Sequence, residues 1–377
     1  MVQAVQRLRF VAAIIVLAWV CATAAAQAAC PSNQDREPQS IAGLTLLGTT
    51  EVRRTPDSAS EHLGGISGLE YDLEKNLWYL LSDDRSQWAP ARFYPAKIAF
   101  DGAHFGAVTV LPPVTLPVPA TEVPDPEALR LIPCTKLLAW SSEGDREHGY
   151  HPSVRLITTD GLPMGELSLP ENLRFSADGK TGARENLSLE GLAPTRDGKS
   201  LWVAMEAPLI QDGAVSGLTR GAKVRFTRLP LDGGKAMQFA YPIDAIPVAA
   251  SGGLQRADNG VSEILVLGDE SLLVIERSGR EMAPNEFAFD IRVYQASVSQ
   301  ADNVIRRHTL DADDVKTMKK KLITNLKDLG LPWIDNIEGA AWGPRLADGR
   351  ASLVLISDDN FARNQVTQMI FFAVEPP

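Results

Sequence analysis

The fold is decided by a short unit that reads Glu190-Gly191-Leu192-Ala193 and, after a turn, Leu201-Trp202-Val203-Ala204-Met205-Glu206. An acidic residue opens the first apolar run, Asp197-Gly198 forms the turn, and a second acidic residue closes the second run. Asp-Gly between two apolar runs is a favoured hairpin turn. The unit therefore predicts two antiparallel β-strands whose paired ends carry carboxylates.

This unit occurs five times. The opening residues are Ser67, Glu127, Glu190, Ser262 and Glu338, and the closing acids are Asp83, Glu143, Glu206, Glu276 and Asp358. Opening and closing residues lie 16, 16, 16, 14 and 20 positions apart, and successive units begin 60, 63, 72 and 76 positions apart. A recurring unit with room for four short strands is typical of a propeller blade. We expect an all-β fold, a β-propeller of five four-stranded blades, with a sixth degenerate blade or an irregular β-sandwich as alternatives.

Two further segments complete this expected architecture. The fifth unit leaves only three strands before the C-terminus, and residues 44–53 alternate well enough to supply the fourth, which would remove an exposed sheet edge. Residues 311–329 place apolar side chains at three- and four-residue steps and are followed by Gly330. We expect them to form an inserted helix that covers a blade edge or the channel mouth.

Residues 1–28 have the features of a signal peptide. Arg7 and Arg9 precede an apolar run at 10–20, and Ala26-Gln27-Ala28 is an A-x-A cleavage site. The run is short for a membrane span. We therefore expect a single domain, residues 29–377, that is periplasmic or secreted and has no transmembrane segment after cleavage. An uncleaved anchor is the alternative.

The expected export also affects the cysteines. After cleavage two remain, Cys30 and Cys134. In an oxidising compartment a disulfide between them would tie the mature N-terminus to the domain. Lipidation of Cys30 is the alternative.

Charge and motifs exclude several classes of function. The formal net charge is −10, whereas nucleic-acid binding needs a positive field. The five histidines are scattered without zinc-ligand spacing. Residues 65–69 miss the final glycine of a nucleophile elbow, and no P-loop, H-E-x-x-H or EF-hand pattern is present. An α/β-hydrolase esterase and a nucleic-acid-binding protein are therefore disfavoured.

The repeated acids are expected to converge. In an antiparallel hairpin the start of one strand lies beside the end of its partner, and the first strand of each blade lines the axis. The expected metal ligands are Asp83, Glu127, Glu143, Glu190, Glu206, Glu338 and Asp358, with Glu276 in the same ring. Crowded carboxylates have raised pKa values or bind cations. Ligand sets made only of oxygen suit Ca²⁺ or Mg²⁺, so we expect one of these ions at the channel mouth.

Arginines accompany these acids. Arg85 follows Asp83-Asp84, and Arg277 follows Glu276. One interpretation is simple ion pairing that holds the blade ends. The other is that these arginines, together with bound cations, hold a phosphate oxygen by bidentate contact.

Four stretches carry a resemblance to a known family: G-I-S-G-L-E-Y-D at 65–72, S-D-D-R at 82–85, E-G-L-A at 190–193 and N-I-E-G-A-A-W at 336–342. They resemble the phytase-like family, whose members are described by an esterase-like activity of phytase, and the resemblance extends from about Gly64 to Phe372. It implies an exported propeller that hydrolyses phosphoesters. The β-propeller phytases bind Ca²⁺ through acidic channel residues, but only this general design carries over, without a residue-by-residue match.

The expected function is therefore metal-dependent hydrolysis of a phosphoric ester. The substrate is expected to be a small phosphate ester and the protein a monomer. We expect Glu190 and Glu338 to serve acid–base catalysis and Arg85 and Arg277 to stabilise phosphoryl charge. The alternatives are a non-catalytic, calcium-stabilised propeller that binds a ligand or protein, and a calcium-dependent lactonase or esterase.

Overall fold

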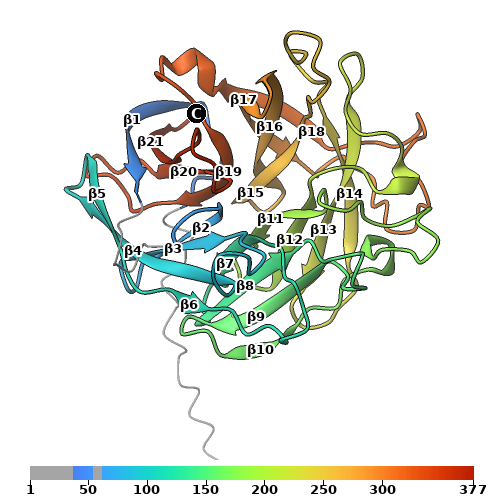
Figure 1. Cartoon of the computed structure of the whole chain (residues 1–377), viewed down its shortest axis with the longest axis horizontal. Coiled ribbons are helices and arrows are strands. Elements are labelled where there is room, and N and C mark those ends of the chain that lie inside the picture. The colour runs from blue at the N-terminus through green and yellow to red at the C-terminus, as the bar shows by residue number, and fades with distance from the viewer. Residues whose placement is uncertain (1–36, 54–61) are drawn as a thin grey trace, which may run out of the picture. The chain divides into compact units, whose positions relative to one another are not determined.

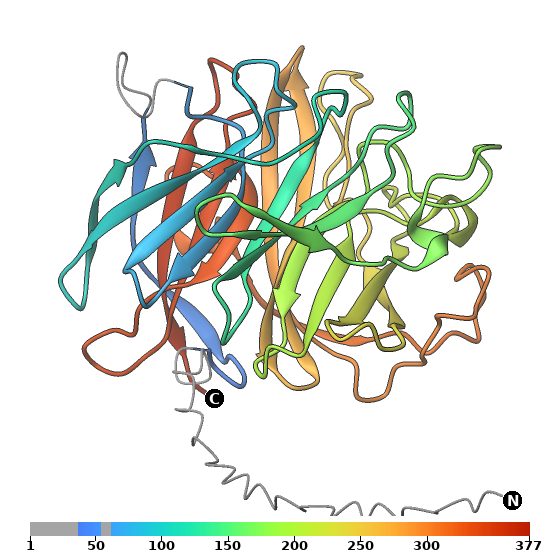
Figure 2. The ribbon, with the colours of Figure 1, turned by 90° about the horizontal axis from the view of Figure 1, so that it is seen from below.

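Five antiparallel sheets surround a common axis in the computed structural model, which describes residues 37–53 and 62–377 (Figure 1). Each sheet is one blade of a β-propeller, and its strands run between the two faces of the ring (Figure 2). Among the described residues, no helix is long and apolar enough to span a bilayer. The expected signal peptide at 1–28 and the region around Cys30 lie outside these residues. Cys134 is disulfide-bonded.

The blades follow one another along the chain. Blade 1 contains β2 (Ile66–Asp72), β3 (Leu77–Ser82), β4 (Arg92–Phe100) and β5 (Phe105–Val110), with β6 (Val114–Thr115) paired to β4. Blade 2 contains β7 (Pro126–Leu131), β8 (Leu137–Ser142), β9 (Ser153–Thr158) and β10 (Pro163–Glu166). Blade 3 contains β11 (Leu189–Pro194), β12 (Ser200–Met205), β13 (Ala222–Pro230) and β14 (Met237–Ile243). A short 3₁₀ turn, η2 (Glu171–Leu173), precedes β11, and another, η3 (Ile210–Asp212), lies between β12 and β13.

The last two blades complete the ring. Blade 4 contains β15 (Gly260–Gly268), β16 (Ser271–Ala283), β17 (Glu286–Ser297) and β18 (Lys319–Asn325). Blade 5 contains β19 (Asn336–Trp342), β20 (Ser352–Asp358), β21 (Thr367–Glu375) and, from the other end of the chain, β1 (Gly43–Val52). Strand β1 pairs antiparallel with β21, with Leu44 opposite Val374. The expectation that residues 44–53 supply the missing strand is thus confirmed, and five blades suffice.

The inserted helix expected at 311–329 is wrong. Residues 319–325 form β18, the outermost strand of blade 4, and only Leu326–Leu329 form a 3₁₀ turn, η4. Blade 4 needs a fourth strand, and pairing with β17 satisfies backbone groups that a separate helix would leave unpaired on that edge. The apolar residues at helical spacing do not form one buried face, because Val315 packs with Leu310 in a loop while Leu322 is 49% exposed.

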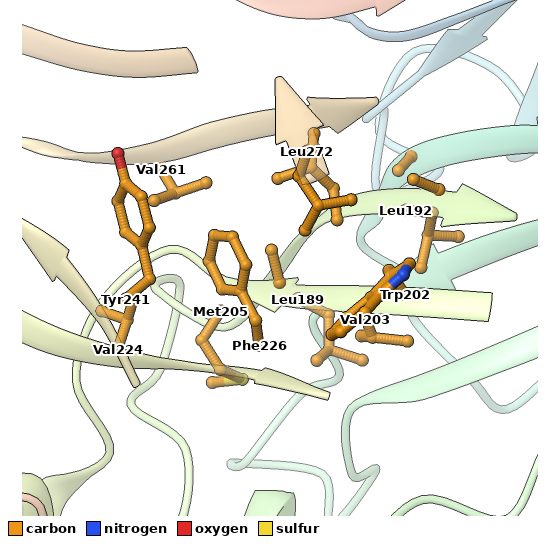
Figure 3. Packing of buried hydrophobic residues seen from close by; sticks show 14 of the residues in the cluster. Leu189, Leu192, Trp202, Val203, Met205, Val224, Phe226, Tyr241, Val261 and Leu272 are labelled. Atoms are coloured by element: carbon orange, nitrogen blue, oxygen red, sulfur yellow. The ribbon is translucent and has the colours of Figure 1, made fainter. Parts of the chain in front are cut away.

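The core lies between neighbouring blades. Figure 3 shows the largest cluster, in which Leu189 and Trp202 of blade 3 pack near Leu272 of blade 4. Phe226 and Tyr241 stack with their ring centroids 4.9 Å apart. A fully buried side chain of this size contributes about 1.5–3 kcal/mol to stability. These contacts fix each blade against the next and so hold the inner strands in a ring.

Candidate functional site

A β-bulge begins the inner strand of every blade. The pairing register shifts between Ile66 and Gly68 in β2, and it shifts at the corresponding place in β7, β11, β15 and β19. The residues at these shifts are the five opening residues: Ser67, Glu127, Glu190, Ser262 and Glu338. A bulge re-aims a side chain out of the alternation of the strand. The repeated Ser or Glu therefore occupies one structural position, at one end of the axis.

Glycine follows the bulge in three blades because neighbouring inner strands approach closely there. A Cβ on Gly191 would lie 2.9 Å from the backbone nitrogen of Ile264, and one on Gly339 would lie 3.0 Å from the carbonyl oxygen of Ser67. The first contact is closer than real Cβ atoms show and the second is close to that limit, so a side chain at either position would force its neighbours to shift. In each Glu-Gly pair, the close packing of the inner strands therefore explains the glycine but not the glutamate.

Arg130 fills the axis below this ring. Its guanidinium forms an ion pair with Glu263, and both side chains are buried. It also donates hydrogen bonds to the carbonyl oxygens of Leu192 (2.7 Å), Leu69 (2.6 Å), Leu129 (2.9 Å) and Ile264 (3.4 Å). These carbonyls belong to the inner strands of four blades. Burial raises the pKa of Glu263 to about 7, against the opposing effect of Arg130.

Above Arg130 lies a cavity of about 370 Å³. Ten carboxylate side chains line it, namely Asp83, Asp84, Asp125, Glu127, Glu143, Glu190, Glu206, Asp258, Glu338 and Asp358, together with two arginines, Arg85 and Arg277. All seven expected metal ligands and all four expected catalytic residues are in this set. The formal charge of the lining is therefore 2 − 10 = −8 if every group is ionised.

Sequence reasoning placed Glu276 in this ring, and that placement is wrong. Glu276 pairs with Val261, whereas Arg277 pairs with Gly260 and occupies the position that Glu206 has in blade 3. A shift of one residue turns a side chain to the other face of its sheet. The inner hairpin of blade 4 also has a second register shift, between Val266 and Gly268, which the other inner hairpins lack.

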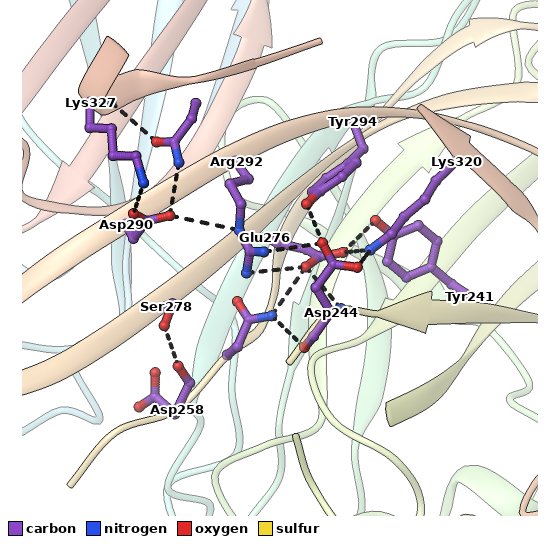
Figure 4. Close-up of polar contacts among 12 residues, drawn as sticks. Tyr241, Asp244, Asp258, Glu276, Ser278, Asp290, Arg292, Tyr294, Lys320 and Lys327 are labelled. Atoms are coloured by element: carbon purple, nitrogen blue, oxygen red, sulfur yellow. Dashed lines mark hydrogen bonds and ion pairs between the residues drawn. The ribbon is translucent and has the colours of Figure 1, made fainter. Parts of the chain in front are cut away.

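Glu276 lies instead in a buried polar cluster on the side of blade 4 (Figure 4). It accepts hydrogen bonds from Tyr241 (2.8 Å) and Asn259 (3.1 Å) and forms an ion pair with Lys320. Arg292 lies 3.6 Å from its carboxylate. Glu276 therefore stabilises the blade and is unavailable to the cavity.

Two glutamates at the centre of the cavity lack partners. Glu127 and Glu190 are each only 8% exposed, and neither carboxylate forms a hydrogen bond or ion pair with the described part of the chain. By contrast, Glu206 and Glu338 bind Arg277, at 2.8 Å and 3.2 Å. A buried carboxylate without a partner is costly unless it is protonated or meets a cation.

The electrostatics of the cavity agree with this interpretation. Burial, followed by repulsion from neighbouring acids, raises the pKa of Glu127 and Glu190 well above the usual range. Burial also raises the pKa of Asp125 to about 6 and that of Glu206 to about 7, although Arg85 and Arg277 act in the opposite direction. Burial and mutual repulsion thus disfavour the ionised form of these carboxyl groups as long as no cation is bound.

The donor set fits a hard divalent cation. Ligand oxygens of Asp125, Glu127 and Glu143 lie within 4.8 Å of one another, as do those of Glu143, Glu190 and Glu206. Glu143 belongs to both groups, and it also accepts a hydrogen bond from the backbone of Ser188. Carboxylate oxygens at such spacing suit Ca²⁺ or Mg²⁺.

Sequence reasoning missed Asp125 and Asp258 as lining residues. Asp125 lies two positions before Glu127, and Asp258 two positions before β15, so each precedes the inner strand of its blade. The expected arginines are both engaged with carboxylates. Arg85 lies 3.1 Å from Asp145 and 3.5 Å from Asp125, so its guanidinium neutralises part of the rim.

Fold and cavity define a five-bladed β-propeller whose inner strands begin at an acidic, oxygen-lined pit. The chain belongs to the phytase-like family: the family model described as "Esterase-like activity of phytase" matches residues 61–361. No curated protein matches the chain.

Solved structures are only weakly similar to this chain. An endo-arabinanase (GH43) from Bacillus licheniformis is 14% identical, with a TM-score of 0.40 over 82% of this chain and 94% of that chain. A mannose phosphorylase from Leishmania mexicana is 13% identical, with a TM-score of 0.39 over 89% of both chains. An α-L-arabinanase from Penicillium chrysogenum is 11% identical, with a TM-score of 0.40 over 87% and 86%. Similarity at this level carries no argument about function.

Proposed function

We propose that this protein is a metal-dependent hydrolase of phosphate esters and that the acidic cavity is its active site. The observation that carries the proposal is the pair Glu127 and Glu190, which are buried, unpartnered among the described residues, and surrounded by further carboxylates. An anionic substrate enters such a cavity only when cations neutralise it. Family membership supports a hydrolase-like propeller that acts on a small molecule.

A cation would be held by Asp125, Glu127 and Glu143, whose ligand oxygens lie within 4.8 Å of one another, and Glu190 would stay free. Bound there, Ca²⁺ or Mg²⁺ would polarise the phosphoryl group and lower the pKa of a water molecule. Arg277, which is held by Glu206 and Glu338, faces the cavity and offers guanidinium N–H groups to phosphoryl oxygens. Arg85 has the same role at the rim.

Glu190 is the best placed general base, because its carboxylate has no hydrogen bond to lose and its raised pKa favours proton uptake. In the proposed step, the water oxygen bonds to phosphorus and the ester P–O bond breaks. Glu190 takes a proton from the water and returns it to the leaving oxygen. Glu338 keeps Arg277 in position through an ion pair at 3.2 Å.

Turnover assays test this function. With Ca²⁺ present, 4-nitrophenyl phosphate should be hydrolysed, and a chelator should abolish the activity. Glu190→Gln should lower kcat/KM by roughly 10²–10⁴-fold, the usual contribution of a general base, whereas exposed Glu147→Gln should not change it. Hydrolysis of 4-nitrophenyl acetate alone would instead identify an esterase.

A second candidate function is a non-catalytic propeller that binds Ca²⁺ for stability. It is favoured by the fact that the cavity is lined by residues from all five blades, so that a cation would tie the blades together. Calcium-dependent melting without turnover of either ester would support this function and refute the hydrolase.

We also propose that residues 1–28 direct export to the periplasm or the medium. The mass of the mature protein, with its N-terminus after Ala28, tests this cleavage.

A further inference from the structure

Two aromatic rings stand at the rim of the cavity. Trp88, from the loop after β3, and Phe361, from the turn after β20, both line it. Their rings stack with centroids 5.6 Å apart and planes 23° from parallel. Trp88 is nevertheless 61% exposed, so the stack with Phe361 leaves much of the indole open to solvent. It lines the same cavity as the carboxylates.

The loop that carries Trp88 is held rigidly. The carboxylate of Asp84 accepts hydrogen bonds from the backbone N–H groups of Gln87 (2.8 Å), Trp88 (3.2 Å) and Ala89 (2.9 Å). Arg92 donates to the same carboxylate at 2.7 Å. Burial opposes ionisation of Asp84, but these hydrogen bonds lower its pKa below the usual range. The loop is therefore fixed before any ligand arrives.

The turn that carries Phe361 is held in the same way. Asp359 accepts hydrogen bonds from the backbone N–H groups of Phe361 (3.0 Å) and Gly65 (2.9 Å). Asn360 and Phe361 both have positive φ, 46° and 51°. Non-glycine residues rarely adopt this conformation, which costs of the order of 1 kcal/mol or more per residue.

The ring of Phe361 also needs the bare backbone beneath it. A Cβ on Gly65 would lie 2.5 Å from its Cε2 atom, and one on Gly64 would lie 2.8 Å from its Cε1 atom. The ring of Phe361 is therefore placed at the rim by several features together: Gly64 and Gly65, the strained turn, and Asp359.

Blades 1 and 5 use one arrangement twice. In Asp83-Asp84 and in Asp358-Asp359, the first aspartate lines the cavity and the second holds the turn that carries the aromatic residue. Packing between the two loops alone does not require an indole that is largely open to solvent, and such exposed apolar surface beside a polar cavity is typical of a ligand contact.

We propose that Trp88 and Phe361 form an aromatic platform that binds a planar ring on the leaving group of the substrate, so that the protein selects aryl over alkyl phosphate esters. This inference rests on the proposed phosphate-ester site. The near-parallel rings already form an offset stack, and a flat ring on the exposed part of the Trp88 indole extends it. The phosphoryl group of the same molecule then reaches the carboxylates and Arg277.

Binding of three non-hydrolysable phosphonates, measured by titration calorimetry with Ca²⁺, tests the platform. Benzylphosphonate and cyclohexylmethylphosphonate carry a six-membered ring one carbon from phosphorus, and ethylphosphonate has no ring. Because aromatic stacking adds to simple area burial, benzylphosphonate should bind about fivefold more tightly than cyclohexylmethylphosphonate. Trp88→Ala should bring this ratio close to one, and Trp88→Phe should keep it above one.

A control variant and the contrary results also test the aromatic platform. Trp333→Ala, which removes another exposed tryptophan that is not among the lining residues, should leave the ratio unchanged. Equal binding of the two ring compounds by the unmodified protein, or a ratio that survives Trp88→Ala, would overturn the platform while leaving the phosphate site intact. If none of the three phosphonates binds, the proposed function fails and the platform fails with it.

Discussion

We expect the carboxylate of Glu206 to make the protein less stable as pH rises when no Ca²⁺ is present. Its pKa is raised from 4.5 to about 7, chiefly by burial. Between these two values the folded protein binds more protons than the unfolded chain does, so the free energy of unfolding falls with increasing pH. Since each pKa unit corresponds to about 1.4 kcal/mol, Glu206 alone removes about 3 kcal/mol by the time pH exceeds 7.

Urea denaturation in a chelator at pH 4.5, 6 and 8 measures this effect. The free energy of unfolding should fall across the series, and Glu206→Gln should remove about 3 kcal/mol of the fall. Arg277 keeps Glu338 as a partner in this variant. Exposed Glu147→Gln is the control and should show the full fall. Saturating Ca²⁺ should stabilise the protein most at pH 8, where the carboxylates are free to bind it.

A free energy of unfolding that is constant or rises between pH 4.5 and 8 in chelator would refute the reasoning. Such a result would mean that the buried acids are neutralised within the protein itself, and that no cation is needed to explain them.

Two further predictions follow from the axis and the rim. Arg130→Met should destabilise the protein by about 3–5 kcal/mol, because it leaves Glu263 buried without its charge partner. Adding Glu263→Gln should recover part of this loss. Equal urea midpoints for the single and double variants would contradict this prediction. Gly65→Ala places a Cβ 2.0 Å from an oxygen of Asp83 at a φ of +59°, so it should lower the melting temperature and weaken Ca²⁺ binding in calorimetry. Gly149→Ala is the control, because its φ is also positive but its Cβ meets no atom within 4 Å. This control should change only the melting temperature.

Much of the fold could be predicted from the repeated unit. Its opening residue and closing acid mark a hairpin, and five hairpins with room for two more strands each define five blades. The strand at 44–53 followed from counting the strands of the last blade. The helix expected at 311–329 failed because helical periodicity in a short apolar pattern is weaker than the requirement of blade 4 for an outer strand.

Only those residues of the site that belong to the repeated unit could be predicted from the sequence. Glu127, Glu190 and Glu338 occupy equivalent bulges, so their convergence could be inferred from the repeat alone. Asp125 and Asp258 lie in loops before the inner strands, outside the repeated pattern. The exchange of Glu276 for Arg277 depends on a one-residue shift within a hairpin, and the stack of Trp88 on Phe361 joins loops 273 positions apart in the sequence. Such contacts are set by tertiary structure.

The pairing of β1 with β21 has a consequence for how the protein is made. A blade whose outer strand comes from residues 43–52 and whose other three strands come from residues 336–375 cannot form until nearly the whole polypeptide has been synthesised. Until then the earliest strand has no partner, and blades 1 and 4 have no neighbour on one side. Pairing of β1 with β21 thus closes the ring. A circularly permuted gene that joins these two segments directly should allow blade 5 to assemble from contiguous sequence.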